Sequence, residues 1–182
     1  DDAAGLSISE KMRSQIRGLD QASRNAQDGI SFIQTAEGAL TEVSSMLTRA
    51  KELHVQRANG TYNVEDIANI DAELESLGEE ITNILDNTAF NGKNVFTEPV
   101  DIAITHDAAG VLNIAIADAA VSGLDLASVT TAVGIDTAID NVNTQRAVYG
   151  SLQNRLEHTI NNLATTSENL AASESRIRDV DM

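Results

Sequence analysis

Apolar residues recur at every seventh position along the first third of the chain. One row comprises Met12, Leu19, Ala26, Ile33, Leu40 and Leu47, and it ends at His54. A second row beside it comprises Ile16, Ile30, Ala36, Val43 and Ala50. Positions three, four and seven apart share one face of an α-helix, and no proline interrupts the span. We therefore predict a first helix over residues 1–59, with an apolar stripe that needs partner helices along its length.

Three glycines, Gly18, Gly29 and Gly38, fall inside this predicted helix. Each costs about 1 kcal/mol relative to alanine in a helix interior. They indicate either close approach of a neighbouring helix or a break into two helices. We favour one helix, because the apolar row keeps its phase across all three glycines. Asn59-Gly60 has the turn chemistry that ends a helix.

Two further helices follow from the same pattern. For the second, over residues 63–88, Asn63 is the predicted N-cap, and apolar residues then alternate in steps of three and four: Ile67, Ile70, Leu74, Leu77, Ile81 and Ile84. Its short link to the first helix predicts an antiparallel pair. The last helix, over residues 128–181, carries an unbroken row with a period of seven: Ile135, Val142, Tyr149, Leu156, Leu163, Leu170 and Ile177.

The segment 94–120 has a different period. Asn91-Gly92 before it is a turn signal, and Val100, Ile102 and Ile104 alternate with less apolar residues, as do Leu112, Ile114 and Ile116. Alternation across a polar turn predicts a β-hairpin with one apolar face, and an isolated hairpin needs a surface to dock on. The chain is thus predicted to be mainly α. We expect an elongated antiparallel bundle of three long helices with a docked β-hairpin, in a single elongated domain over residues 1–182.

Composition argues against several functions. The net charge of −16 disfavours nucleic acid as a partner, since phosphates would be repelled. The chain has no cysteine and no apolar run of about 18 residues, so neither a disulfide nor a membrane span is expected. Its histidines, His54, His106 and His158, do not form HExxH, and no nucleophile or phosphate-binding motif occurs. We therefore expect no enzyme activity, no metal and no cofactor.

One surface of the first helix has the makeup of a binding site. If the row through Leu40, Leu47 and His54 faces the core, Leu53 lies about 100° away from it. The geometry then predicts an outward Leu53 between Arg49 and Gln56. An outward leucine beside an arginine is typical of an interface anchor, although a single exposed leucine is also common.

Long stretches of the chain closely resemble bacterial flagellin. The N-terminal stretch, at residues 1–40, is DDAAGLSISEKMRSQIRGLDQASRNAQDGISFIQTAEGAL, and residues 47–63 read LTRAKELHVQRANGTYN. The turn after the second helix is NTAFNGKNVF, and residues 145–182 read QRAVYGSLQNRLEHTINNLATTSENLAASESRIRDVDM. These sequence stretches are similar to those of flagellins from Bacillus-like bacteria. The chain is identified as the family's rod domain, without the terminal segments needed for polymerisation.

The resemblance implies a structural function. Flagellin is the secreted subunit of the bacterial flagellar filament, exported and assembled by the flagellar machinery, and its rod domain contacts other subunits. The fragment by itself is then expected to be a monomer. The alternative is a flagellin-like hook–filament junction protein. Some flagellins also carry a metallopeptidase insert, but that insert would require HExxH.

The family's rod domain is also a ligand of the vertebrate innate immune receptor Toll-like receptor 5. The motif that carries this recognition resembles RxxELxxQ on the first helix with a glutamate on the second. It falls here on Arg49, Glu52, Leu53, Gln56 and Glu73. Two neighbours depart from many receptor-active flagellins: Lys51 stands where arginine is common, and His54 replaces a smaller residue. The resemblance therefore implies receptor binding at these five residues.

Overall fold

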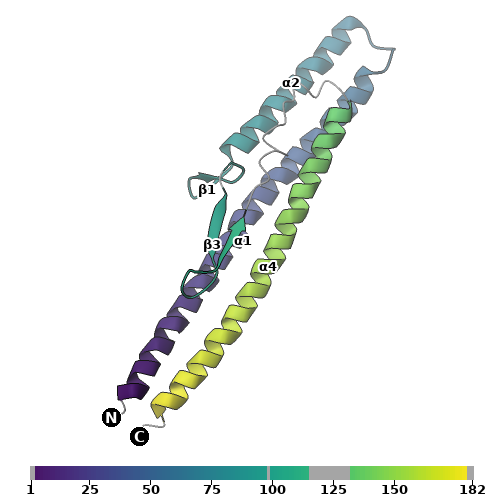
Figure 1. Cartoon of the computed structure of the whole chain (residues 1–182). Coiled ribbons are helices and arrows are strands. Elements are labelled where there is room, and N and C mark those ends of the chain that lie inside the picture. Colours follow the sequence, from purple (N-terminus) through teal and green to yellow (C-terminus); the bar gives the residue numbers. More distant parts are fainter. Residues whose placement is uncertain (1–2, 98, 115–131, 180–182) are drawn as a thin grey trace. The chain divides into compact units, whose positions relative to one another are not determined.

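The computed structural model describes residues 3–97, 99–114 and 132–179. It contains three long helices, α1 (Ala3–Arg57), α2 (Val64–Asn87) and α4 (Ala132–Asp179) (Figure 1). Four short strands form two antiparallel pairs, β1 (Ala89–Phe90) with β2 (Lys93–Asn94), and β3 (Val100–Ala103) with β4 (Val111–Ile114). The prediction of a mainly α fold with three long helices and a β-hairpin is confirmed.

The predicted helices over residues 1–59 and 63–88 are observed as α1 (Ala3–Arg57) and α2 (Val64–Asn87). The end of the predicted hairpin segment, 115–120, and the predicted start of the last helix at residue 128 lie outside the described residues. The β1–β2 pair was not predicted, because two-residue strands leave no alternating pattern. Its turn is the predicted Asn91-Gly92, with φ of 51° and 79°. No helix in the described parts of the chain is both long and apolar enough to cross a membrane.

The chain divides into two compact units. The first unit takes Asp1–Ser31, Val100–Ile114 and Ser151–Met182, and the second takes Phe32–Pro99 and Ala115–Gly150. Both α1 and α4 contribute residues to each unit. A single elongated domain over residues 1–182 stays a prediction, and the two units are described separately below.

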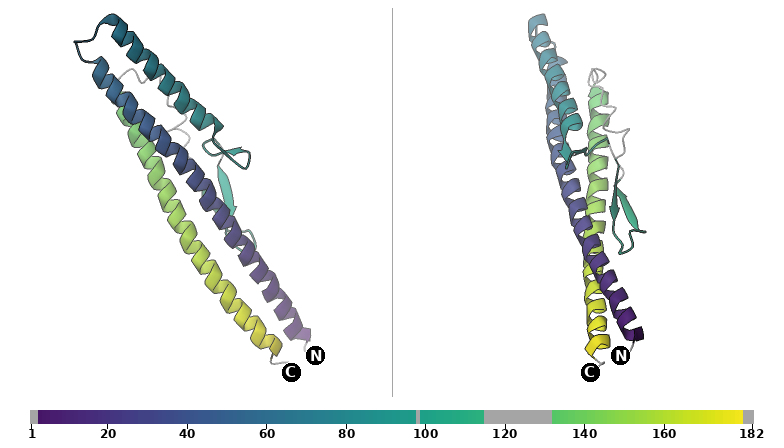
Figure 2. Two further views of the ribbon diagram at one scale, coloured as in Figure 1. Left: turned by 180° about the vertical axis from the view of Figure 1, so that it is seen from behind. Right: turned by 90° about the vertical axis from the view of Figure 1, so that its left-hand side faces the viewer.

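In the first unit, α1 and α4 run antiparallel, and two hydrogen bonds fix their register. Ser9 Oγ donates to Glu174 Oε1 at 2.9 Å, and Ser167 Oγ donates to Asp20 Oδ1 at 3.2 Å. The two views of Figure 2 show these parts of the helices side by side. Their core is built from small and medium apolar side chains, namely Leu19, Ala22 and Leu163, with Leu170 packed against them.

The β3–β4 hairpin docks on this helix pair, as its apolar face predicted. Ile102 pairs with Leu112, and both side chains are buried, as is Ile114. Asn25 Nδ2 on α1 donates to the carbonyl oxygen of Ala103 at 3.1 Å. The hairpin is therefore held by apolar burial and by a hydrogen bond between the first helix and the edge of β3.

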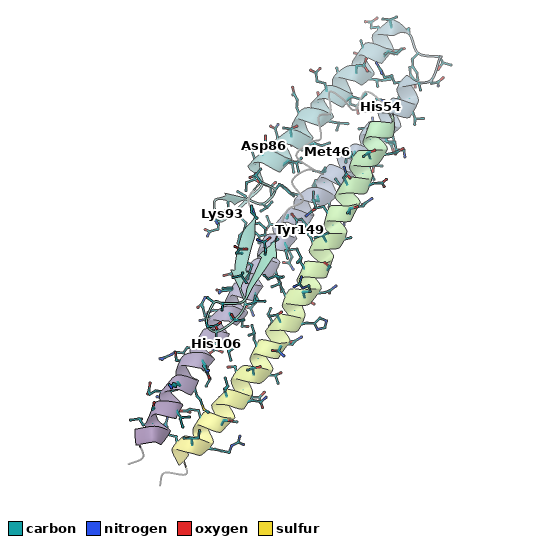
Figure 3. All side chains as sticks on the ribbon, viewed as in Figure 1. Met46, His54, Asp86, Lys93, His106 and Tyr149 are labelled. Atoms are coloured by element: carbon teal, nitrogen blue, oxygen red, sulfur yellow. The ribbon has the colours of Figure 1, made fainter. Side chains whose placement is uncertain are left out.

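In the second unit, α1 packs against both α2 and α4. The rows with a period of seven form its core, and their fully buried members include Ile33, Leu40, Leu47, Ile135, Val142 and Tyr149. Figure 3 labels Tyr149 on α4 and His54 on α1, which is also buried. Asn63 caps α2 as predicted, since its side chain accepts the Asp66 N–H at 2.8 Å. Lys51 and Asp136 join α1 to α4 at 2.6 Å.

The glycines of α1 do not interrupt the helix, which confirms the preference for one helix. A Cβ at Gly18 would lie 2.6 Å from the carbonyl oxygen of His106, and one at Gly29 would lie 3.2 Å from Ile102 Cγ1. The close neighbour of Gly18 is therefore the hairpin and not the predicted helix, whereas Gly29 lies close to the hairpin and also to Leu156 of α4, at 3.3 Å. Among the described residues, nothing lies within 4 Å of a Cβ at Gly38, so the predicted close approach of a helix is not found there.

Candidate functional site

The predicted binding surface lies in the second unit, where α1 and α2 meet, and Arg49 is at its centre. Arg49 Nη2 and Nε donate to Glu73 Oε1 of α2 at 2.9 and 3.0 Å. Arg49 Nη1 donates to Glu52 Oε2 of α1 at 3.3 Å. The three side chains remain 45–64% exposed. The hydrogen bonds to Glu73 and Glu52 raise the pKa of Arg49 above its ordinary value, so the guanidinium stays charged.

Gln56 extends the surface toward the α1–α2 connection. Its side-chain Nε2 donates to the hydroxyl oxygen of Tyr62 at 3.0 Å, and the residue is exposed. One turn beyond Leu53, Arg57 Nε approaches Asp71 Oδ1 of α2 to 2.7 Å. Four of the five predicted site residues, Arg49, Glu52, Gln56 and Glu73, are therefore exposed, and three of them form one hydrogen-bonded cluster.

The prediction that Leu53 faces outward is wrong. Its side chain is 1% exposed. Arg49, Leu53 and Arg57 are four residues apart and share one helix face, and both arginines pair with carboxylates of α2. The face that carries Leu53 is therefore the face that α2 covers. The sequence argument assumed one buried row on α1, whereas α1 has two neighbours in this unit, and Ala50 packs with residues of both.

The described residues offer no arrangement for metal-dependent chemistry. In residues 3–97, 99–114 and 132–179, no three histidine or carboxylate side chains lie together where they could hold a metal ion. His54 is buried on α1, while His106 and His158 are exposed in the first unit.

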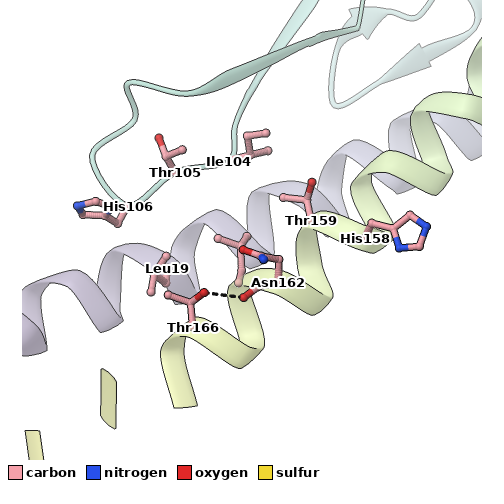
Figure 4. Close-up of a pocket in the computed structure, with 9 residues that line it drawn as sticks. Leu19, Ile104, Thr105, His106, His158, Thr159, Asn162 and Thr166 are labelled. Atoms are coloured by element: carbon pink, nitrogen blue, oxygen red, sulfur yellow. Dashed lines mark hydrogen bonds between the residues drawn. The ribbon is translucent and has the colours of Figure 1, made fainter. Parts of the chain in front are cut away.

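Sequence reasoning missed a groove in the first unit, lined by His106, His158 and seven other residues (Figure 4). It is built from α1, the β3–β4 hairpin and α4, which are far apart in the sequence. The one feature of the sequence that could have indicated this groove is Gly18, because the hairpin turn approaches α1 there.

Comparison with known proteins assigns the chain to a family. Residues 1–100 match the bacterial flagellin N-terminal helical region, and residues 133–182 match the bacterial flagellin C-terminal helical region. The chain is 48% identical to flagellin of Halalkalibacterium halodurans and 44% identical to flagellin of Bacillus subtilis. These matches cover 100% of this chain and 72% and 75% of the two relatives.

Two further relatives extend this result. The flagellar filament 33 kDa core protein of Treponema phagedenis is 43% identical, over 100% of this chain and 73% of that protein. The crystal structure of Bacillus cereus flagellin superposes with a TM-score of 0.66 at 30% identity, covering 83% of this chain and 94% of that one. The matches include the helical regions at both ends of the sequence. The chain belongs to the bacterial flagellin family and is a structural, non-enzymatic subunit of the extracellular flagellar filament.

Proposed function

We propose that this filament subunit is also a ligand of Toll-like receptor 5, and that the receptor binds the surface formed by Arg49, Glu52, Gln56 and Glu73. The observation that carries the proposal is the exposed Arg49–Glu73 pair, at 2.9 Å. It joins the receptor motif of α1 to the glutamate of α2 that the family resemblance requires. Contacts with the flagellar export machinery stay a prediction from the family.

The hydrogen bonds within the surface favour binding. Glu73 and Glu52 hold the guanidinium of Arg49 from two sides, so its long side chain is ordered before a partner arrives. Ordering a flexible side chain on binding costs about 0.5–1.5 kcal/mol, and a surface organised in advance avoids part of that cost. Arginine is also enriched among the residues that dominate interface energies.

In this proposal Leu53 does not contact the receptor as an outward anchor would. Because it is buried on the face of α1 whose arginines pair with α2, we infer that it supports the surface by holding α2 against α1. Truncating Leu53 would then weaken receptor binding through the position of Glu73, together with a loss of stability. Truncating Arg49 would weaken binding with the fold intact.

The test is binding of the purified receptor ectodomain to this chain and to Arg49→Ala. Truncating an interface anchor costs about 2 kcal/mol or more, which is roughly thirtyfold in affinity. Arg155→Ala is the matched control, since Arg155 is an exposed arginine of α4 in the other unit. We expect Arg49→Ala to lose at least about thirtyfold and Arg155→Ala to bind as the parent does, with equal helicity by circular dichroism.

Two results would contradict the proposal. If the parent does not bind, the chain is not a receptor ligand, and Lys51→Arg and His54→Ala then show whether these two departures from the motif are responsible. If the parent binds and Arg49→Ala binds equally well, the receptor uses another surface.

A further inference from the structure

The sequence contains the dipeptide Asn-Gly twice, at Asn59-Gly60 and at Asn91-Gly92. An asparagine before a glycine is chemically labile. The backbone nitrogen of the glycine can attack the side-chain carbonyl carbon of the asparagine, and glycine has no side chain to obstruct the attack. Both pairs connect secondary-structure elements of the second unit, and the structure holds them in different conformations.

Asn59-Gly60 lies in the connection between α1 and α2, where its geometry favours the attack. Asn59, Gly60 and Thr61 are all exposed. The N–H of Thr61 donates to Asn59 Oδ1 at 3.3 Å, and such a turn folds the side chain back along the backbone toward the intervening glycine. The same hydrogen bond polarises the side-chain carbonyl and would stabilise the negative charge that develops on Oδ1 during the attack.

The attacking nitrogen of Gly60 is free to move. Among the described residues, none accepts a hydrogen bond from the Gly60 N–H, and none lies within 4 Å of a Cβ built at Gly60. The backbone hydrogen bond that spans the pair, from Tyr62 N–H to the carbonyl oxygen of Asn59, is long at 3.4 Å. The peptide between Asn59 and Gly60 can therefore rotate without breaking a packing contact.

Asn91-Gly92 is held more firmly. These residues form the loop of the β1–β2 hairpin, with φ of 51° and 79°, and Phe90 pairs with Lys93 on either side of them. The next residue of β2, Asn94, donates from Nδ2 to the carbonyl oxygen of Leu85 at 2.9 Å, which ties the hairpin to the end of α2. Bringing the Gly92 nitrogen onto the Asn91 side chain requires this hairpin to open locally, which costs free energy.

We propose that Asn59 is a site of spontaneous deamidation, and that the fold protects Asn91 from the same reaction. The Gly60 nitrogen forms a bond to Asn59 Cγ, the bond between Cγ and Nδ2 breaks, and Nδ2 leaves as ammonia with the proton of the Gly60 N–H. The product is a cyclic succinimide. Water from the solvent opens the ring, at the side-chain carbonyl to give aspartate or at the main-chain carbonyl to give isoaspartate. Either product adds a negative charge to the chain.

The modification would change the end of α1 and its connection to α2. A carboxylate at residue 59 lies just beyond the C-terminus of α1, where the helix dipole disfavours negative charge. Isoaspartate also adds a methylene to the main chain between Gln56 and Tyr62, whose side chains are hydrogen-bonded at 3.0 Å. Deamidation is therefore expected to loosen this connection, whether or not the neighbouring surface binds a receptor.

The first test compares the two pairs within one chain. The folded chain and the chain unfolded in guanidinium chloride are incubated at mildly alkaline pH, and peptide mass spectrometry follows the gain of about 1 Da at each asparagine. We expect folding to slow the reaction of Asn91 at least about tenfold, which is about 1.4 kcal/mol in activation free energy, and that of Asn59 less than about threefold. Equal protection of the two pairs, or faster reaction at Asn91 than at Asn59 in the folded chain, would overturn the proposal.

A second test identifies the attacking group. Gly60→Ala adds a Cβ to the residue that carries the nucleophile, in a place with no described residue within 4 Å and at a φ outside the left-handed region, so the fold should be kept. We expect deamidation of Asn59 to slow at least about tenfold, with the rate at Asn91 as in the parent. Enzymatic methylation of isoaspartyl carboxylates should fall in parallel. An unchanged rate at Asn59, with the fold intact by circular dichroism, would show that the Gly60 nitrogen is not the nucleophile.

Discussion

Replacing Gly18 by alanine should loosen the β3–β4 hairpin, even though alanine is the better helix former. The added Cβ would lie 2.6 Å from the carbonyl oxygen of His106 and 2.9 Å from its Cβ. The first of these neighbours is backbone, which cannot rotate away as the end of a flexible side chain can. The hairpin turn must therefore move off α1, and the hydrogen bond from Asn25 to Ala103 and the contact of Ile102 with α1 weaken with it.

The magnitude follows from two opposing terms. Overpacking of this kind costs typically about 1–3 kcal/mol, and removing a glycine from a helix interior gains about 1 kcal/mol. The net loss for Gly18→Ala is then about 0–2 kcal/mol. Gly38→Ala lies in the same helix, and no described residue lies within 4 Å of the new Cβ. It therefore shows the helix term alone and should stabilise the chain by about 1 kcal/mol. The difference between the two variants, about 1–3 kcal/mol, isolates the cost of overpacking.

The assay is urea unfolding followed by circular dichroism, together with hydrogen exchange of the amides of residues 100–114. Gly18→Ala should unfold at lower urea than Gly38→Ala, and its hairpin amides should exchange faster than those of the parent, because the hairpin opens locally. If the two variants are equally stabilised and hairpin exchange is unchanged, the hairpin turn does not depend on Gly18, and the account of its docking is wrong.

Three other predictions concern buried groups. Leu53→Ala should cost about 2–5 kcal/mol in urea unfolding, because the side chain is 1% exposed. Val55→Ala, at a position that is 66% exposed, should stay within about 0.5 kcal/mol of the parent, and equal losses would contradict the burial of Leu53. Glu174→Ala should lower stability by about 1–3 kcal/mol in thermal unfolding, because its carboxylate is 13% exposed, accepts a hydrogen bond from Ser9 at 2.9 Å and forms an ion pair with Arg13 at 3.2 Å; an unchanged melting temperature would show that these contacts add nothing. Burial raises the pKa of Tyr149, so the stability that its neutral form contributes is complete below pH about 10 and is lost as the pH rises through the folded-state pKa. Tyr149→Phe should lose less stability than the parent above pH 10 in pH-dependent urea unfolding, and an equal loss would show that Tyr149 is not responsible.

The sequence predicted only part of the arrangement of the candidate site. The motif placed Arg49, Glu52 and Glu73 correctly at one surface, because spacing along α1 fixes the first two and the short α1–α2 connection sets which part of α2 lies opposite. The helix geometry placed Leu53 on the wrong side of α1, since its side chain is buried. The direction of one buried row does not say how many neighbours a helix has, and α2 covers the face that the helix geometry had left open.

The sequence by itself determined the three helices, the apolar hairpin face and the family. Rows with a period of seven, the cap at Asn63 and alternation around residues 100–114 are local signals, and each is read from residues close together in the chain. The tertiary structure alone decided that Leu53 is buried, that Gly18 and Gly29 lie against the hairpin whereas Gly38 has no described residue within 4 Å of its Cβ position, and that a groove lined without Asp, Glu, Lys or Arg exists in the first unit. These features depend on which elements meet, and the physical reason is that burial and steric contact arise between segments remote in sequence, where no local period records them.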